Sequence, residues 1–178
     1  MRVLGIIGPS GCGKTTMLKQ LSKDGLVYVN PTYTDRPKRN GSEEELEHKF
    51  VSSKEFGRLK ESGFFIKTVK AFGLDYRYGV PKLREEKGKI ALVMLRVQLV
   101  PLLLKYYPDS TVYQIEAPLF MAKAWMEKRG DREIGTRMEG FEKEMKGGRG
   151  LANRVFINKD DSTACAEEIK KALKIDFK

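Results

Sequence analysis

The sequence of 178 residues has little cysteine and little histidine: Cys12, Cys165 and His48 are the only residues of these types. Two cysteines so far apart in the chain do not make the disulfide framework of a small secreted protein, so a reducing compartment is expected. A zinc site needs at least three protein ligands, and this supply is poor. The sequence therefore excludes a disulfide scaffold and argues against a zinc-dependent protein.

Long hydrophobic runs are also missing. The longest apolar stretch, residues 90–104, is interrupted by Arg96, Gln98 and Pro101 and is shorter than the roughly 20 residues that span a bilayer. The first ten residues, MRVLGIIGPS, contain one arginine and a short apolar core, which is too short for a secretory signal. These absences predict a cytoplasmic protein with no membrane partner.

Negative charge is in the minority, because 34 Lys and Arg residues face 24 Asp and Glu residues, a net charge of +10. Such a balance favours anionic partners, among them nucleotides, nucleic acid and acidic membrane surfaces. The aromatic and basic platform that is typical of RNA and single-stranded DNA binders is not visible. We therefore expect small-molecule nucleotide partners and no nucleic acid, and we leave open whether the chain is a monomer or a homodimer.

Short apolar segments alternate with segments of helical periodicity along most of the chain. The pattern predicts strands at 2–7, 26–29, 90–95, 111–115 and 154–157. It predicts helices at 13–23, 98–107, 119–128, 138–146 and 163–173, with Gly147 to Gly150 ending the fourth of them. A strand, helix, strand order implies parallel pairing. The prediction is an α/β protein, a three-layer fold around a five-stranded parallel core sheet.

The regular alternation of apolar strands and helices is interrupted between residues 31 and 81. The segment from Asn30 to Gly41 contains two prolines and no apolar period, and a run of glutamates follows it, so we expect it to be exposed. A short helix at 53–62, opened by Ser52 or Ser53, precedes a strand at 64–72. Residues 73–79, GLDYRYG, are interpreted as a turn and a second strand. These features predict a small α+β insert in the parallel fold.

The strongest motif lies between the first strand and the first helix. Residues 8–15, GPSGCGKT, match G-x-x-x-x-G-K-[ST] at every fixed position. Glycines allow backbone N–H groups to converge on a phosphate, and the helix directs its positive end at the same anion. Lys14 is then placed for the β- and γ-phosphates and Thr15 for Mg²⁺. The ATP-binding residues predicted here are Gly8, Pro9, Ser10, Gly11, Cys12, Gly13, Lys14, Thr15 and Thr16, with Cys12 as a small loop residue.

A P-loop by itself does not identify the reaction. Asn158 to Asp161 reads N-K-D-D and fits the N-K-x-D motif with which small GTPases read guanine. It lies about 20 residues from the end of the sequence, and no D-x-x-G follows an apolar strand. The GTPase interpretation is therefore disfavoured.

A second segment is more specific. Thr34 to Gly41 reads TDRPKRNG, His48 to Ser52 reads HKFVS, and Glu55-Phe56 follows. These residues resemble the guanylate kinase family, in which T-T-R-x-P-R-x-G, Y-x-F-V-S and E-E-F occur at the same spacing. Further matches, at Tyr78-Gly79, Arg129-Gly130, Arg137 and Asn158, extend the resemblance over nearly the whole chain.

The resemblance implies a single guanylate kinase-like domain that acts as a nucleoside monophosphate kinase. Residues 1–30 and 82–178 would form the core with the P-loop, residues 31–81 the acceptor-binding insert, and residues 128–137 a short lid. The implied activity moves the γ-phosphoryl group of ATP, with Mg²⁺, to the phosphate of a nucleoside monophosphate, with GMP to GDP as the first expectation.

The resemblance also implies roles for individual residues. Phosphoryl transfer between two polyanions needs charge neutralisation, and arginines supply bidentate forks for phosphate oxygens. The implied catalytic residues are Lys14, Arg36, Arg39, Arg129 and Arg137, with Arg132 left open. The implied substrate-binding residues are Thr34, Arg36, Arg39, His48, Lys67, Tyr78 and Arg96. Asn158 would lie by the donor adenine, and Thr15 would ligate the metal.

The acceptor site departs from the family pattern. Ser42 and Lys67 stand where the family has glutamates, and Met94 and Arg96 replace the two carboxylates of L-D-I-D. A cation cannot accept hydrogen bonds from guanine but suits a second anionic group. The sequence therefore keeps two alternatives, a kinase similar to ribose 1,5-bisphosphate kinases and a non-catalytic guanylate kinase-like binding module. As an alternative, Asp75 would supply the carboxylate for a base from a different position in the chain.

Overall fold

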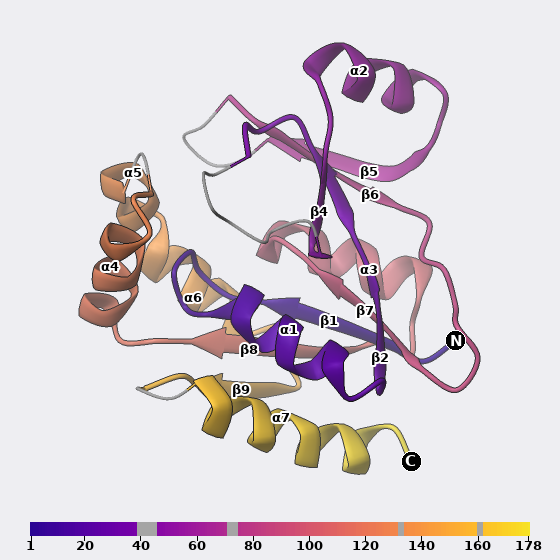
Figure 1. The fold of residues 1–178 in the computed structure, drawn as a ribbon. Coiled ribbons are helices and arrows are strands. Elements are labelled where there is room, and N and C mark those ends of the chain that lie inside the picture. The colour runs from indigo at the N-terminus through magenta and orange to yellow at the C-terminus, as the bar shows by residue number, and fades with distance from the viewer. Residues whose placement is uncertain (39–45, 71–74, 132–133, 160–161) are drawn as a thin grey trace.

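The computed structural model describes residues 1–38, 46–70, 75–131, 134–159 and 162–178. Its larger sheet has five parallel strands in the order β2-β7-β1-β8-β9 (Figure 1). The strands are β1 (Val3–Ile7), β2 (Val27–Asn30), β7 (Ile90–Met94), β8 (Thr111–Glu116) and β9 (Arg154–Ile157). The sequence-based prediction of a five-stranded parallel core is confirmed, and the order places β1, which leads into the P-loop, at the centre.

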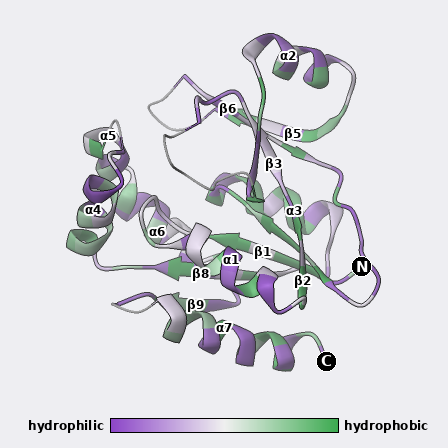
Figure 2. Ribbon diagram, in the orientation of Figure 1, coloured by the Kyte–Doolittle hydropathy of each residue, from purple (hydrophilic) through white to green (hydrophobic). Residues whose placement is uncertain are grey.

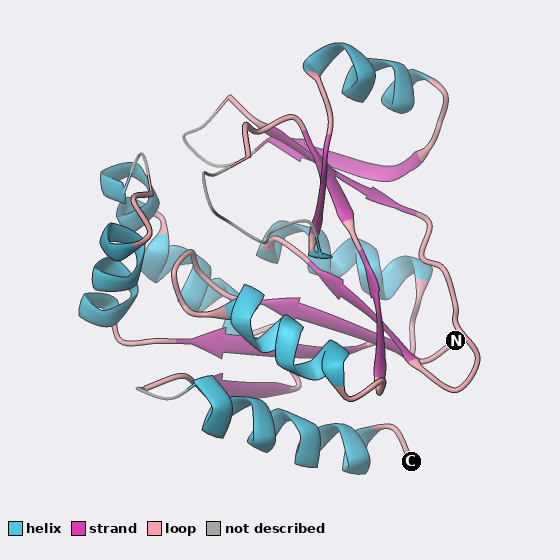
Figure 3. Cartoon of the chain, viewed as in Figure 1, coloured by secondary structure: helices cyan, strands magenta, loops and turns pink. Residues whose placement is uncertain are grey.

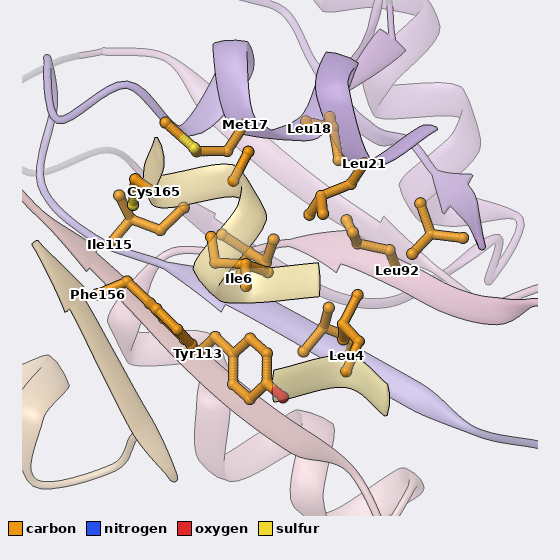
Figure 4. Close-up of a cluster of buried hydrophobic side chains, with 14 of the residues drawn as sticks. Leu4, Ile6, Met17, Leu18, Leu21, Leu92, Tyr113, Ile115, Phe156 and Cys165 are labelled. Carbon is orange, nitrogen blue, oxygen red and sulfur yellow. The ribbon is translucent and has the colours of Figure 1, made fainter. Parts of the chain in front are cut away.

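Helices cover both faces of this sheet. Because side chains alternate along a strand, Leu4 and Ile6 of β1 face one side and Val3 and Ile7 face the other. The first side packs against α1 (Lys14–Lys23) and α7 (Ser162–Asp176), as the close-up in Figure 4 shows with Met17, Leu18 and Cys165 above the sheet. The second side packs against α3 (Val100–Tyr106), which the short 3₁₀ helix η2 (Val97–Leu99) precedes. The result is the predicted three-layer arrangement.

The insert has a four-stranded mixed sheet in the order β4-β3-β6-β5. Its elements are β3 (Thr32–Thr34), β4 (His48–Phe50), α2 (Ser53–Glu61), β5 (Phe65–Lys70) and β6 (Arg77–Pro81). Ser52 caps α2 by accepting a hydrogen bond from the Glu55 backbone N–H at 3.1 Å, as its sequence suggested. In Figure 3 this smaller sheet lies above the core sheet, with β3 following directly after β2 and α2 at the top of the view.

The expectation that residues 30–41 are exposed is wrong for β3. Thr32 and Thr34 are buried, and Arg36 is only 5% exposed. The Thr34 hydroxyl donates to the Arg77 carbonyl at 2.8 Å, and the Thr32 hydroxyl lies 2.7 Å from Nδ1 of His48. Hydrogen bonds within the insert therefore allow a strand with no apolar period to be buried.

The region after β8 also differs from the sequence prediction. It contains α4 (Leu119–Lys128), α5 (Ile134–Glu139) and α6 (Phe141–Arg149). A single helix at 138–146 ended by glycines was expected, but α6 continues through Gly147 and Gly148. A side chain at Gly148 would collide with the side chain of Gln114 on β8. The glycine therefore permits close packing of helix on sheet and does not end the helix.

None of the helices in the described part of the chain is both long enough and apolar enough to cross a membrane. In Figure 2, β1 and β8 are hydrophobic along their length, whereas α7 carries hydrophilic residues along its outer side. This is the pattern of a sheet buried between helices.

Candidate phosphate-binding cleft

The P-loop adopts a turn that requires glycine. Gly8, Gly11 and Gly13 have φ angles of 143°, 81° and 91°, a range that side chains rarely tolerate. At Gly13 a Cβ would also collide with the side-chain amide of Asn158. The glycines therefore hold the loop in a conformation that other residues would prevent, directly in front of α1.

The N-terminus of α1 is open to an anion. Gly13 is its N-cap, no side chain caps it, and its first turn contains no acidic residue. The first N–H groups of a helix lack partners within the helix and carry partial positive charge. Lys14 lies at the same end, where its Nζ donates to the Pro9 carbonyl at 2.7 Å. The predicted phosphate cradle is thus present in its geometry.

Three predicted ATP-binding residues lie around this cradle. Cys12 is fully buried, and burial raises the pKa of its thiol, so it is a neutral packing residue. Thr16 is exposed and, together with Asn158 and Trp125, borders a hollow beside the P-loop. Asn158 is 2% exposed and donates from Nδ2 to the Cys12 carbonyl at 3.2 Å. Asn158 therefore links the end of β9 to the P-loop.

A basic cluster borders the space in front of the P-loop, from the insert and from the segment between β7 and η2. The guanidinium of Arg36 lies 5.3 Å from the ring centre of Phe50, and that of Arg96 lies 5.1 Å from the ring centre of Tyr78. Arg96 also donates to Glu144 of α6 at 2.8 Å. Burial opposes ionisation of Tyr78, but the charges of Arg96 and Arg36 outweigh it and lower the pKa of the phenol. The two guanidinium groups therefore make the surroundings of the Tyr78 hydroxyl electropositive.

Arg129 and Arg137 approach from the other side of the same space. Arg129, at the end of α4, donates to the buried carboxylate of Asp131 at 2.7 Å. Arg137 lies on the half-buried side of α5, and burial lowers its pKa. The charges of Tyr78 and Asp131 oppose this lowering of the pKa, and those of Arg36 and Arg96 add to it. Arg36, Arg96 and Arg137 border the same space.

These segments border one cleft. It is lined by Gly8, Ser10, Gly11, Gly13, Lys14, Thr15, Thr32, Arg36, Glu47, His48, Tyr78, Met94, Leu95, Arg96, Leu99, Arg129, Arg137 and Glu144. Among these described residues the cationic side chains outnumber the carboxylates, which are Glu47 and Glu144. An excess of fixed positive charge in a concave site attracts polyanions.

The structure brings together most of the side chains that the sequence singled out. Thr34 is an exception: it is fully buried, its hydroxyl accepts a hydrogen bond from the Arg36 backbone N–H at 3.2 Å, and it does not line the cleft. Lys67 is exposed on β5 and likewise lies outside the lining. Arg39 and Arg132 fall outside the described residues. Thr34 is thus placed to orient Arg36, and nothing places Lys67 near the phosphate cradle.

Sequence reasoning missed several lining residues. Thr32, Glu47, Met94, Leu95, Leu99 and Glu144 border the cleft but were not predicted to bind anything. Met94 and Leu95 could have been predicted, because ligands bind at the carboxyl ends of parallel strands and β7 ends at Met94. Glu47 stands in a glutamate run that resembles a solvated surface, so its burial left no signal in the sequence.

The described residues contain no group of three or more His, Cys, Asp or Glu side chains able to hold a metal by themselves. This fits Mg²⁺, which is usually bound by one or two protein oxygens together with substrate phosphates and water. Thr15 Oγ1 is such an oxygen, and it lies 3.0 Å from each carboxylate oxygen of Glu47. The donor set is therefore compatible with magnesium bound together with a nucleotide.

Comparison with known proteins first defines the class. A family model described as the Rad17 P-loop domain matches residues 1–94, just over half of the chain. The chain therefore belongs to this family of P-loop domains, in agreement with its loop geometry.

The particular family follows from longer similarities. The guanylate kinase of Oleidesulfovibrio alaskensis is 36% identical over 99 residues, covering 54% of this chain and 48% of that protein. That of Prochlorococcus marinus is 27% identical over 141 residues, covering 78% and 74%. The first of these matches thus spans about half of its relative's length. The crystal structure of guanylate kinase from Anaplasma phagocytophilum superposes with a TM-score of 0.74 at 23% identity, over 98% of this chain and 85% of that one. The protein is a guanylate kinase-like member of the P-loop class.

Proposed function

We propose that the protein is an ATP-dependent phosphotransferase that moves the γ-phosphoryl group of ATP to the phosphate of a nucleoside monophosphate, with GMP as the first candidate. One observation carries this proposal. Lys14 and Thr15 of the P-loop border the same cleft as Arg36 of the insert and Arg129 and Arg137 near α5. A kinase that joins two phosphates needs two anion sites facing each other across a short space.

In this proposal the P-loop N–H groups and Lys14 bind the β- and γ-phosphates of ATP. Bound Mg²⁺ supplies charge neutralisation there, with Thr15 as its protein ligand. The adenosine extends into the hollow bordered by Thr16, Trp125 and Asn158. Oδ1 of Asn158 is buried with no hydrogen-bond partner among the described residues, which suits a donor group on a base.

Arg36 holds the acceptor phosphate, together with His48, Tyr78 and, by resemblance, Arg39. Arg129 and Arg137, within a lid at residues 128–137, neutralise the charge of the transferring group. No general base is needed, because an acceptor phosphate oxygen is already anionic. Closure of the insert and lid would exclude water, so that the phosphoryl group reaches the acceptor and not the solvent.

Arg96 favours a second candidate acceptor. Its guanidinium borders the cleft where the guanylate kinase pattern has a carboxylate, and it donates a hydrogen bond to Glu144 at 2.8 Å. A phosphorylated sugar with a second phosphate, such as ribose 1,5-bisphosphate, would use this cation directly. A non-catalytic binding module is the third candidate, but an intact Lys14-Thr15 pair argues against it.

The test is a coupled assay of ADP release with ATP and Mg²⁺ against GMP, dGMP, AMP, CMP, UMP, dTMP and ribose 1,5-bisphosphate. We expect turnover with at least one of these acceptors. Turnover with GMP alone supports the first candidate. Turnover with only the sugar bisphosphate, and a raised KM for it in Arg96→Met, supports the second. Tight ATP binding with no turnover on any acceptor would contradict the enzyme and favour the binding module. Nucleotide partners and a cytoplasmic location form part of the same proposal.

A further inference from the structure

Glu47 occupies an unusual position for a residue of an acidic surface run. Its side chain is 5% exposed, and the Thr15 hydroxyl donates to its two carboxylate oxygens, each at 3.0 Å from Oγ1. Its backbone is fixed by β3, because the Thr32 N–H donates to the Glu47 carbonyl at 3.0 Å. The insert therefore delivers a buried carboxylate to the P-loop residue that follows Lys14.

A carboxylate beside a phosphate cradle repels phosphate unless a cation lies between them. Magnesium binds its oxygen ligands at about 2.0–2.1 Å in an octahedron, so neighbouring ligands are about 3.0 Å apart. The hydrogen bond from Thr15 to Glu47 holds the oxygens at 3.0 Å, and this separation is close to that edge, so one cation can replace the hydroxyl proton between them without a large movement. The pair therefore has the spacing of two adjacent magnesium ligands.

The surrounding residues favour Glu47 for this task. Met94 and Arg96 at the end of β7 provide no carboxylate to the cleft, and Glu144 is engaged by Arg96. His48 also lies close to Glu47, with its Nε2 3.7 Å from Oε1. Among the described lining residues, Glu47 is the carboxylate positioned beside Thr15.

We propose that Glu47 is a magnesium ligand for the bound nucleotide, directly or through one water, and that it acts together with Thr15. The inference rests on the proposed function, since it requires ATP at the P-loop. It assigns to the insert a role on the donor side of the reaction. One cation would then neutralise the triphosphate and also tie the insert to the P-loop.

The test measures metal binding without turnover. Mn²⁺, which replaces Mg²⁺ and has an electron paramagnetic resonance signal, is titrated into the protein with a β,γ-imido analogue of ATP. Glu47→Gln keeps the size of the side chain and removes its charge. We expect it to weaken Mn²⁺ binding at least tenfold, while binding of the metal-free analogue stays equal or becomes tighter. Glu61→Gln, an exposed glutamate on α2, is the matched control and should bind Mn²⁺ like wild type.

Two results would overturn the inference. Unchanged Mn²⁺ affinity in Glu47→Gln would show that the carboxylate does not serve the metal. If Glu47→Gln bound the analogue more tightly than wild type by the same factor with and without metal, Glu47 would only obstruct the nucleotide through its contact with Thr15. Thermal melting establishes whether the variant folds. If it does not, Glu47→Asp replaces it, and the inference predicts Mn²⁺ binding weaker than wild type with metal-free binding unchanged. If the wild-type protein bound no nucleotide at all, the proposed kinase function itself would be contradicted.

Discussion

The two sheets of the molecule are built from different interactions. In the core sheet every residue of β1 and β7 is buried, and apolar side chains from both faces pack against helices. In the insert sheet β5 is half-buried with exposed lysines, and β3 is held by threonine hydroxyls. The core thus fixes the P-loop by hydrophobic packing, whereas the insert fixes its arginine by hydrogen bonds and ring contacts.

This difference separates the expected effects of mutation. Because the P-loop is supported by a rigid core, a substitution there should change the rate of phosphoryl transfer and the binding of ATP, the phosphoryl donor. A substitution in the insert should change the binding of the acceptor substrate and also the stability of the insert itself.

The first prediction concerns Lys14, which faces the cleft from the start of α1. Lys14→Ala removes a fixed positive charge from the phosphate cradle, and we expect kcat to fall by about 10²–10³-fold. Lys23→Ala, an exposed lysine at the other end of α1, is the control and should leave the kinetics unchanged. Steady-state assays with the best acceptor measure both. Normal turnover by Lys14→Ala would show that the P-loop lysine takes no part in phosphoryl transfer.

The second prediction concerns Arg36 on the insert side. Arg36→Lys keeps the charge and loses the bidentate fork, so we expect the acceptor KM to rise by about 10–100-fold, or about 1.4–2.7 kcal/mol, with the KM of ATP nearly unchanged. Arg84→Lys, an exposed arginine outside the cleft, is the matched control. An equal rise in the KM values of ATP and of the acceptor would contradict the assignment of Arg36 to the acceptor side alone.

The third prediction compares neighbouring glycines of α6. A methyl group at Gly148 would collide with the Gln114 side chain, whereas one at Gly147 would meet Val97 only at 3.6 Å, an ordinary contact. We expect Gly148→Ala to lower the free energy of unfolding by about 1–3 kcal/mol. Gly147→Ala should raise it by up to about 1 kcal/mol, since alanine favours helix. Urea denaturation measures both, and equal effects of the two changes would contradict the packing argument.

The fourth prediction concerns acid and the insert. Burial opposes ionisation of Asp35, but hydrogen bonds from Arg77 and Ser53 outweigh it and lower the pKa of the carboxyl group. Its stabilising effect is therefore complete above the pKa of an unfolded aspartate, about 3.9, and is lost as the pH falls through the lower, folded-state value.

Asp35→Asn should remove this part of the acid dependence. Between pH 5 and pH 2, we expect the melting temperature of wild type to approach that of the variant as the advantage of the carboxylate disappears. Differential scanning calorimetry at several pH values measures the gap. A gap that stays constant over the whole range would mean that Asp35 contributes no pH-linked stability.

Much of the core was predictable because its signals are local. The apolar runs give β1, β7 and β8, and the glycine pattern gives the P-loop before α1. Arg36, Tyr78, Arg129 and Arg137 were found through family motifs, and the structure places all of them at one cleft.

The insert was less predictable, for a physical reason. The burial of β3 depends on partners that are far away in the sequence, such as Arg77 for Thr34. The position of Glu47 beside Thr15 depends on pairing of β3 with β4. Neither contact leaves an apolar period, and so polar residues that are held by distant hydrogen bonds resemble a solvated loop.

The most direct test of the account follows the label from [γ-³²P]ATP in a single turnover with Mg²⁺ and each candidate acceptor. The account predicts that label moves to the phosphate of GMP or of the sugar bisphosphate much faster than to water, and that Lys14→Ala and Arg36→Lys each slow this transfer. Label that appears only as inorganic phosphate, or remains on ATP with every acceptor, would contradict the claim that the two anion sites face each other for phosphoryl transfer.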